Sequence, residues 1–149
     1  MYKHILVSTD GSKLSLKAVK EAAELARTCK AKITALYVIE PYMPRISDES
    51  MIPLGLSRDQ AAYRKISEKT AADALAKVEK GLATAKVKCT TEFVTDPMPW
   101  HGIIETAKKR KCDLVVMASH GRGGFAGLVL GSETHKVLAH SKIPVLVCR

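Results

Sequence analysis

The sequence has no apolar run long enough to cross a bilayer, so we predict no membrane-spanning helix and no membrane partner. Aromatic residues make up only 5% of the chain and stand far apart. The sequence therefore lacks the closely spaced stacking residues that single-strand nucleic-acid binders use. Repeats, low-complexity segments and linkers are also missing. What remains is an ordinary globular composition with 46% apolar residues, and we expect one domain over residues 1–149.

The four cysteines form no Cys-x-x-Cys pair; they stand at positions 29, 89, 112 and 148. Metal sites and disulfide frameworks depend on characteristic cysteine spacings, so we favour four reduced thiols over either alternative. The first residues run directly into a strand-like stretch and leave no room for the charged and apolar regions of a signal peptide. These two features predict a cytoplasmic protein.

Positive charge is in excess, because 24 lysines and arginines stand against 15 aspartates and glutamates and give a net charge of +9. Such an excess favours an anionic partner, which could be a nucleotide, a nucleic acid or an acidic protein. The charges are nevertheless spread along the chain, and Lys13, Lys17 and Lys20 lie at helical spacing. Because no groove-reading element accompanies them, we favour a solvated helix face over a nucleic-acid partner.

Strand-like and helix-like segments alternate along the whole chain. Apolar runs predict strands over residues 4–9, 32–39, 87–95, 113–118 and 143–148. Helical periodicity predicts four helices between them, the second over residues 58–83 and the third around residues 103–107. Ser12 and Ser132 are the expected N-caps of the first and last helices. Residues 40–57 read as a long irregular stretch.

The helical segments also predict which side chains face the core. The expected buried positions are Val19, Ala22, Ala23 and Ala26 in the first helix, Ala71, Leu75, Val78 and Leu82 in the second, and Val137 and Leu138 in the last.

This order of elements indicates the α/β class, as a single-domain open parallel sheet of five strands with helices on both faces. Ligands of such sheets bind beyond the carboxyl ends of the strands. The candidate binding residues are therefore those that follow each strand: Asp10, residues 38–40, Thr95 with Asp96, and the loop after Ala118.

The loop after Ala118 is rich in glycine up to Gly131, and its composition suits an anionic group. Glycines allow close approach of the backbone to a ligand, and the free amides and dipole at the start of the following helix attract phosphate. The loop is not a P-loop, because no lysine stands between Gly131 and Ser132. Residues 121–126 formally match a dinucleotide-binding pattern, but they follow the fourth strand, and we treat that match as chance.

Several motifs together point to one family. They are Thr9-Asp10-Gly11-Ser12, Tyr37-Val38-Ile39, the run from Asp113 to Gly121, Gly131-Ser132, and Ile-Pro-Val-Leu-Val at residues 143–147. On these motifs the chain resembles the universal stress protein family over its whole length. The ATP-binding branch of that family carries glycine, two residues, glycine, nine residues, glycine, then serine or threonine. Gly121, Gly131 and Ser132 fit this motif, whereas Ala118 stands at its first position.

The resemblance implies a fold of the adenine-nucleotide alpha-hydrolase type, with strand order 3-2-1-4-5, and it implies ATP as the ligand, with Mg or Mn. Thr9 and Asp10 would lie at the nucleotide, and Asp10 would contact the ribose or a phosphate-bound metal. Val38 would contact adenine through its backbone, with Met117 near the base. The phosphates would meet the backbone at Ala118, Gly121, Gly131, Ser132 and Glu133, and the hydroxyls of Ser119 and Ser132. The resemblance also implies a homodimer through the C-terminal strand.

The function that the resemblance implies is an ATP-binding regulatory protein of the stress response, acting as a dimeric switch or sensor. We predict no catalytic residue and at most slow ATP hydrolysis. The chain shows neither a P-loop lysine nor an arginine finger, the groups that stabilise the transition state of phosphoryl transfer. The alternative is a dimeric interaction module that does not bind ATP, which Ala118 and the carboxylate of Glu133 would favour. Asp10 has a plain alternative role as a helix cap, and we interpret His120 as structural and Trp100 as a packing residue.

Overall fold

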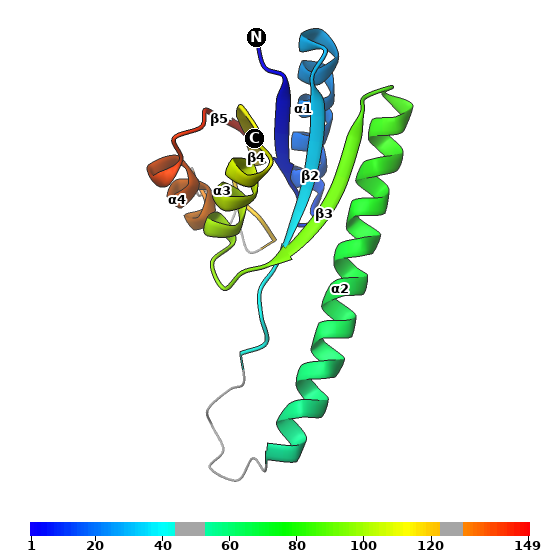
Figure 1. Cartoon of the computed structure of the whole chain (residues 1–149), viewed down its shortest axis with the longest axis vertical. Helices are drawn as coiled ribbons and strands as arrows, with labels where there is room; N and C mark the ends of the chain where they lie inside the picture. Colours follow the sequence, from blue (N-terminus) through cyan, green and yellow to red (C-terminus); the bar gives the residue numbers. More distant parts are fainter. Residues whose placement is uncertain (44–52, 123–129) are drawn as a thin grey trace.

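The computed structural model describes residues 1–43, 53–122 and 130–149. Strands and helices alternate along these residues (Figure 1). The elements in chain order are β1 (His4–Ser8), α1 (Lys13–Cys29), β2 (Lys32–Ile39), α2 (Pro53–Thr84), β3 (Cys89–Thr95), α3 (Pro99–Lys109), β4 (Leu114–Ala118), α4 (Ser132–His140) and β5 (Val145–Cys148).

The strands form one parallel sheet in the order β3-β2-β1-β4-β5, which confirms the predicted fold. β1 lies at the centre, where Val7 is opposite Ala35 of β2 and Val116 of β4. All five strands therefore end at the same edge of the sheet, and the segments that follow them meet there.

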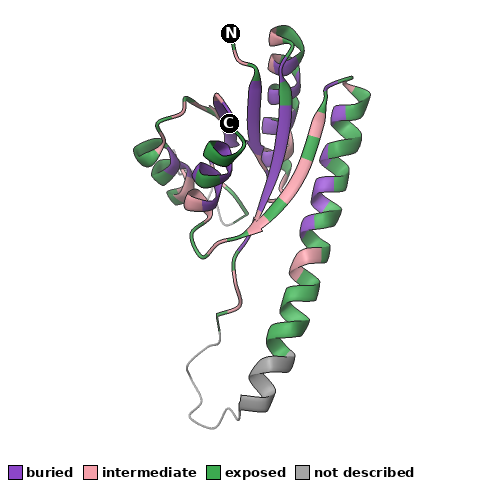
Figure 2. Cartoon of the chain, viewed as in Figure 1, coloured by how far each residue is buried: buried purple, intermediate pink, exposed green. Residues whose placement is uncertain are grey.

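Two apolar layers cover the two faces of the sheet. Ile5 and Val7 of β1 face one layer, formed with α1 and α2, whereas Leu6 faces the other, formed with α3 and α4. This alternation follows from the period of two along a strand. The central strands β1, β2 and β4 are largely buried, whereas residues 59–66 of α2 are exposed (Figure 2). The predicted inward positions of α1 and α2 are all buried, and all four cysteines are free.

Two predicted helix boundaries are wrong. α2 begins at Pro53, so residues 53–57 are helical although an irregular stretch was expected there; proline suits this position because the first turn needs no amide donor. Residues 44–52 of that stretch lie outside the described residues. α4 has Gly131 as its N-cap, and Ser132 is its first helical residue.

One predicted core residue of α4 is also wrong. Val137 is fully buried, whereas Leu138 is 43% exposed. A step of one residue turns a side chain by about 100° around the helix axis, and the short α4 buries only a narrow stripe with Thr134 and Val137. In the part of the chain that the structure describes, no helix is long and apolar enough to span a membrane.

Candidate functional site

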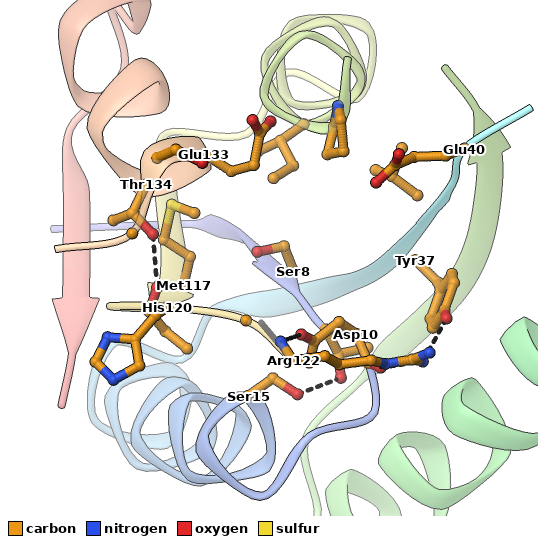
Figure 3. A pocket seen from close by; sticks show the side chains of 18 of the residues that line it. Ser8, Asp10, Ser15, Tyr37, Glu40, Met117, His120, Arg122, Glu133 and Thr134 are labelled. Carbon is orange, nitrogen blue, oxygen red and sulfur yellow. Dashed lines mark hydrogen bonds between the residues drawn. The ribbon is translucent and has the colours of Figure 1, made fainter. Parts of the chain in front are cut away.

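A cavity of about 1170 Å³ opens at the carboxyl ends of the strands. The ends of β1, β2 and β4 and the residues after them line it, together with the start of α4 (Figure 3). Pro99 and Ile103 of α3 and one side of α2 complete the lining. Nine of the ten predicted site residues line this cavity: Thr9, Asp10, Val38, Met117, Ala118, Gly121, Gly131, Ser132 and Glu133. The sheet therefore brings together residues that the sequence places more than 100 positions apart.

Asp10, directly after β1, is a charged acceptor in this cavity. Its Oδ1 accepts a hydrogen bond from the amide of Ser12 at 2.9 Å, and its Oδ2 accepts one from the amide of Arg122 at 2.9 Å. Burial alone would raise the pKa of Asp10, but hydrogen bonds from Ser12, Ser15 and Arg122 outweigh it and hold that pKa below its usual value. The carboxylate is therefore ionised near neutral pH.

The turn that carries Asp10 is fixed by buried hydroxyl groups. Thr9 Oγ1 accepts a hydrogen bond from the amide of Gly11 at 3.1 Å and lies 2.9 Å from Ser15 Oγ. Gly11 has φ +80°, a conformation that glycine adopts without steric cost. Ser12 accepts a hydrogen bond from the amide of Ser15 and caps α1 as predicted.

Arg122 connects two strand ends across the cavity. Its Nε donates to the backbone oxygen of Asp10 at 2.7 Å, and its Nη2 donates to the same oxygen and, at 2.6 Å, to the hydroxyl of Tyr37 (Figure 3). The sequence singled out neither Arg122 nor Tyr37 as a site residue. Their contacts could not be predicted from the sequence, because they join residues 85 and 112 positions apart.

Two glycines permit close approach of chain segments at this site. A Cβ on Gly121 would lie 2.8 Å from Oδ2 of Asp10. A Cβ on Gly131 would lie 3.1 Å from the backbone oxygen of Ser119 and from Cα of His120. The amide of Gly131 also donates to the oxygen of Ser119 at 2.7 Å. A side chain at residue 121 would therefore displace the carboxylate of Asp10, and one at residue 131 would press on the backbone of residues 119 and 120.

Ala118 causes no backbone strain at the first motif position. It ends β4 opposite Cys148, its φ is not among the positive values, and it packs in the buried layer with α1. The hydroxyl of Thr134, which sequence reasoning missed, donates to the backbone oxygen of Ala118 at 3.0 Å and joins α4 to the strand end.

Ser119 is the one predicted site residue that does not line the cavity. The residue is fully buried, its Oγ lies 3.0 Å from Nδ1 of His120, and its amide donates to the oxygen of Cys148 at 2.7 Å. Ser119 follows β4 directly, and these contacts draw it toward β5 rather than toward the cavity.

The carboxylate of Glu133 is engaged by neighbouring groups. Its Oε2 accepts a hydrogen bond from the amide of Trp100 at 2.9 Å, and its Oε1 accepts one from Lys136 Nζ at 3.0 Å. Met98, the N-cap of α3, provides no side-chain cap, so Glu133 of α4 performs that role for α3. These two donors partly offset the negative charge of Glu133, which weakens its repulsion of an anion at the start of α4.

The end of β3 contributes nothing to the cavity, contrary to the expectation for Thr95 and Asp96. Asp96 instead accepts a hydrogen bond from the amide of Met98 at 2.8 Å and lies 2.7 Å from Nδ1 of His101. One side of α2 also faces the cavity, with Tyr63, Ile66, Ser67 and Thr70. The sequence did not indicate these residues as part of the site, because helical spacing is the only pattern that they share.

A family model and a curated relative both identify the same protein family. A family model described as the universal stress protein family matches residues 1–149. Universal stress protein MJ0531 of Methanocaldococcus jannaschii is 34% identical over 152 residues, which cover 100% of this chain and 83% of that protein.

Two solved structures share the fold over nearly the whole chain. Universal stress protein UspA from Lactobacillus plantarum is 28% identical with a TM-score of 0.83, and the match covers 99% of this chain and 98% of that one. A universal stress protein solved in complex with cAMP is 26% identical with a TM-score of 0.72, and the match covers 99% and 97%.

Proposed function

The chain belongs to the universal stress protein family, and we propose on that premise that it binds an adenine nucleotide, ATP in the first place, in the cavity at the carboxyl ends of β1, β2 and β4. The observation that carries the proposal is the start of α4, whose residues 132–134 line this cavity together with Gly121 and Gly131. The relative solved with cAMP supports the same class of ligand.

The start of α4 suits the phosphates. In an α-helix the first amides have no partner within the helix, so the amides of Ser132, Glu133 and Thr134 are donors for an anion, and the helix dipole favours negative charge there. Arg122 and Lys136 add positive charge from the cavity wall.

The other end of the nucleotide would lie toward β2 and β4. Val38 would meet adenine through its backbone and Met117 would pack near the base, since both residues line the cavity at strand ends. Asp10 would accept hydrogen bonds from the ribose or hold a divalent ion bound to the phosphates. Within the described ranges no three histidine, cysteine or acidic side chains gather to hold a metal, so Mg or Mn would bind together with the phosphates.

The proposed role is that of a cytoplasmic, dimeric switch or sensor of the stress response rather than an enzyme. β5 is an edge strand and its Leu146 is 41% exposed, which supports a homodimer formed through this strand, since edges of sheets are usually paired or covered. Slow hydrolysis is the most that we expect from the site.

A dimeric interaction module that does not bind ATP is the second candidate. The hydrogen bonds of Arg122 favour it, because they satisfy the guanidinium, Asp10 and Tyr37 without any ligand. A nucleotide phosphate would have to compete with these contacts.

Thermal unfolding in the presence of Mg-ATP separates the two candidates. A ligand that binds only the folded state stabilises it by about 2.7 kcal/mol at a hundredfold excess over Kd, so the melting temperature should rise steadily with ATP concentration. GTP at the same concentrations is the comparison for base selectivity. An unchanged melting temperature at millimolar ATP would reject nucleotide binding and leave the interaction module.

A further inference from the structure

Lysines gather at the amino ends of the strands, at the end of the sheet opposite the cavity. Each strand has an exposed lysine at its first residue or in the segment before it. The seven residues are Lys3, Lys30, Lys32, Lys86, Lys88, Lys111 and Lys142. We call this set the basic end. It lies at the top of Figure 1, where α1 and α2 end and β2 and β3 begin.

Backbone hydrogen bonds bring three of these lysines into adjacent strands. The amide of Lys32 donates to the oxygen of Lys3 at 3.1 Å, and the amide of Ile33 donates to the oxygen of Lys88 at 2.9 Å. Neighbouring strands lie about 4.8 Å apart, so Lys3, Lys32 and Lys88 form a row across the sheet. Their separation along the sequence conceals this row.

Three further lysines occupy positions where glycine is the usual residue. Lys30, Lys86 and Lys111 follow α1, α2 and α3 with φ values of 56°, 57° and 55°. Each helix ends in the same turn, in which the next amide reaches back five residues: Ala31 to Ala26, Val87 to Leu82, and Cys112 to Ala107. Glycine fits this left-handed position best, yet all three turns carry a lysine.

Little negative charge offsets the basic end. Asp113 accepts hydrogen bonds from the amides of Lys3 and His4, at 2.8 and 3.0 Å. Among the described residues none of the seven lysines forms an ion pair, whereas Lys108 and Arg110 nearby are paired with glutamates. A dense, uncompensated charge of one sign attracts a polyanion.

The chemistry of the surface selects the kind of polyanion. A protein interface has an apolar or aromatic centre, and a membrane-binding surface adds large apolar side chains to its charge. Among the described residues, Met1 is the only exposed large apolar residue that adjoins the basic end. Tyr2, the aromatic residue beside Lys3, is partly buried against the core, so the described surface of the basic end has no exposed aromatic side chain on which single strands could stack. What remains is electrostatic contact with closely spaced, outward-facing phosphates.

We propose that the basic end binds the phosphate backbone of double-stranded nucleic acid, independently of sequence. The spread of charge along the chain argued against a nucleic-acid partner, but the fold gathers these lysines at one end. This surface and the cavity lie at opposite ends of the strands, so the proposal does not depend on nucleotide binding.

The test compares two triple variants of the full chain for binding to a fluorescently labelled DNA duplex of mixed sequence, followed by anisotropy at several salt concentrations. One variant carries Lys30→Gly, Lys86→Gly and Lys111→Gly; glycine favours these φ values, so folding is preserved. The control carries Lys20→Gln, Lys65→Gln and Lys77→Gln, which remove the same charge from exposed helix positions elsewhere. Thermal unfolding of all three proteins verifies that each is folded.

The wild type and the control should bind the duplex with a linear dependence of log K on log salt. The glycine variant should bind roughly tenfold more weakly and show a slope smaller by about 2 to 3, since each lost phosphate contact removes about 0.9. Absence of duplex binding by the wild type at low salt would overturn the proposal, as would equal weakening in both variants. If the lysines serve only their helix ends through the helix dipole, the glycine variant would lose stability and keep its affinity, which would also overturn it.

Discussion

At the scale of single residues, Gly121 lies close to the carboxylate of Asp10 in the wall of the cavity. The two residues come from different motifs, and the sequence indicated both as candidates. It could not show that a side chain at residue 121 would collide with Asp10. That constraint arises only because β1 and β4 are neighbours in the sheet.

Asp10 should make the stability of the protein depend on pH. Its pKa is lower in the folded state than its usual value, so its stabilising contribution is present above the unfolded pKa of about 3.9 and is lost as pH falls through the folded value. The Asp10→Asn variant should be less stable than the wild type at neutral pH. The difference should shrink steadily in urea unfolding series below about pH 4, and a difference that grows on acidification would contradict this assignment.

Residue-level predictions failed where side-chain direction or long-range pairing decides the outcome. Ser119 was expected in the cavity because it follows β4, but its contacts with His120 and Cys148 bury it. Arg122 and Tyr37 meet only in the folded chain. Asp10, Val38, Gly131 and Ser132 all line the cavity, because each adjoins a strand end or a helix start that periodicity had already indicated.

At the scale of elements, α4 offers the sharpest check of packing. Val137 is fully buried and its neighbour Leu138 is 43% exposed. Val137→Ala should destabilise the protein by about 2 kcal/mol through lost burial and a cavity, whereas Leu138→Ala should stay within about 0.5 kcal/mol of the wild type. Chemical denaturation of both variants measures the difference, and a larger loss for Leu138→Ala would contradict the orientation of α4.

The elements themselves could be predicted well wherever periodicity was strong. β2 has the expected bounds, residues 32–39, because its apolar run is flanked by clear helix and loop residues. The start of α2 could not be placed, because proline and glycine within residues 53–57 resemble a loop in sequence although the helix includes them. The predicted N-cap of α4 was one residue too late. Gly131 takes that position, where it lies close to Ser119, a contact that the sequence does not reveal.

At the scale of the whole molecule, the sheet has two edge strands, and only one is proposed to pair with a second copy. Leu146 on β5 and Phe93 on β3 are both 41% exposed. Leu146→Glu should convert a homodimer into monomers in light-scattering measurements, because it places a charge in the proposed interface. Phe93→Glu is the matched control and should remain dimeric; dissociation by Phe93→Glu alone would assign the interface to β3.

The two ends of the sheet also differ in what sequence could predict. The cavity follows from a general property of parallel sheets, so its position was foreseeable from the order of elements. The basic end was not foreseeable, because whole helices separate the lysine-bearing segments in the sequence and the pairing of strands brings these segments together. Charge patterns built from turns are therefore harder to recognise than patterns on one helix face.

Isothermal titration of the protein with Mg-ATP tests nucleotide binding at the cavity most directly, when three proteins are compared. Gly121→Val places a side chain against Asp10, whereas Gly81→Val is a matched change at an exposed position in α2 where a Cβ meets no atom within 4 Å. The wild type and Gly81→Val should each bind one nucleotide per chain, and Gly121→Val should lose saturable binding. No saturable binding by the wild type at millimolar ATP, or full binding by Gly121→Val, would contradict the proposal.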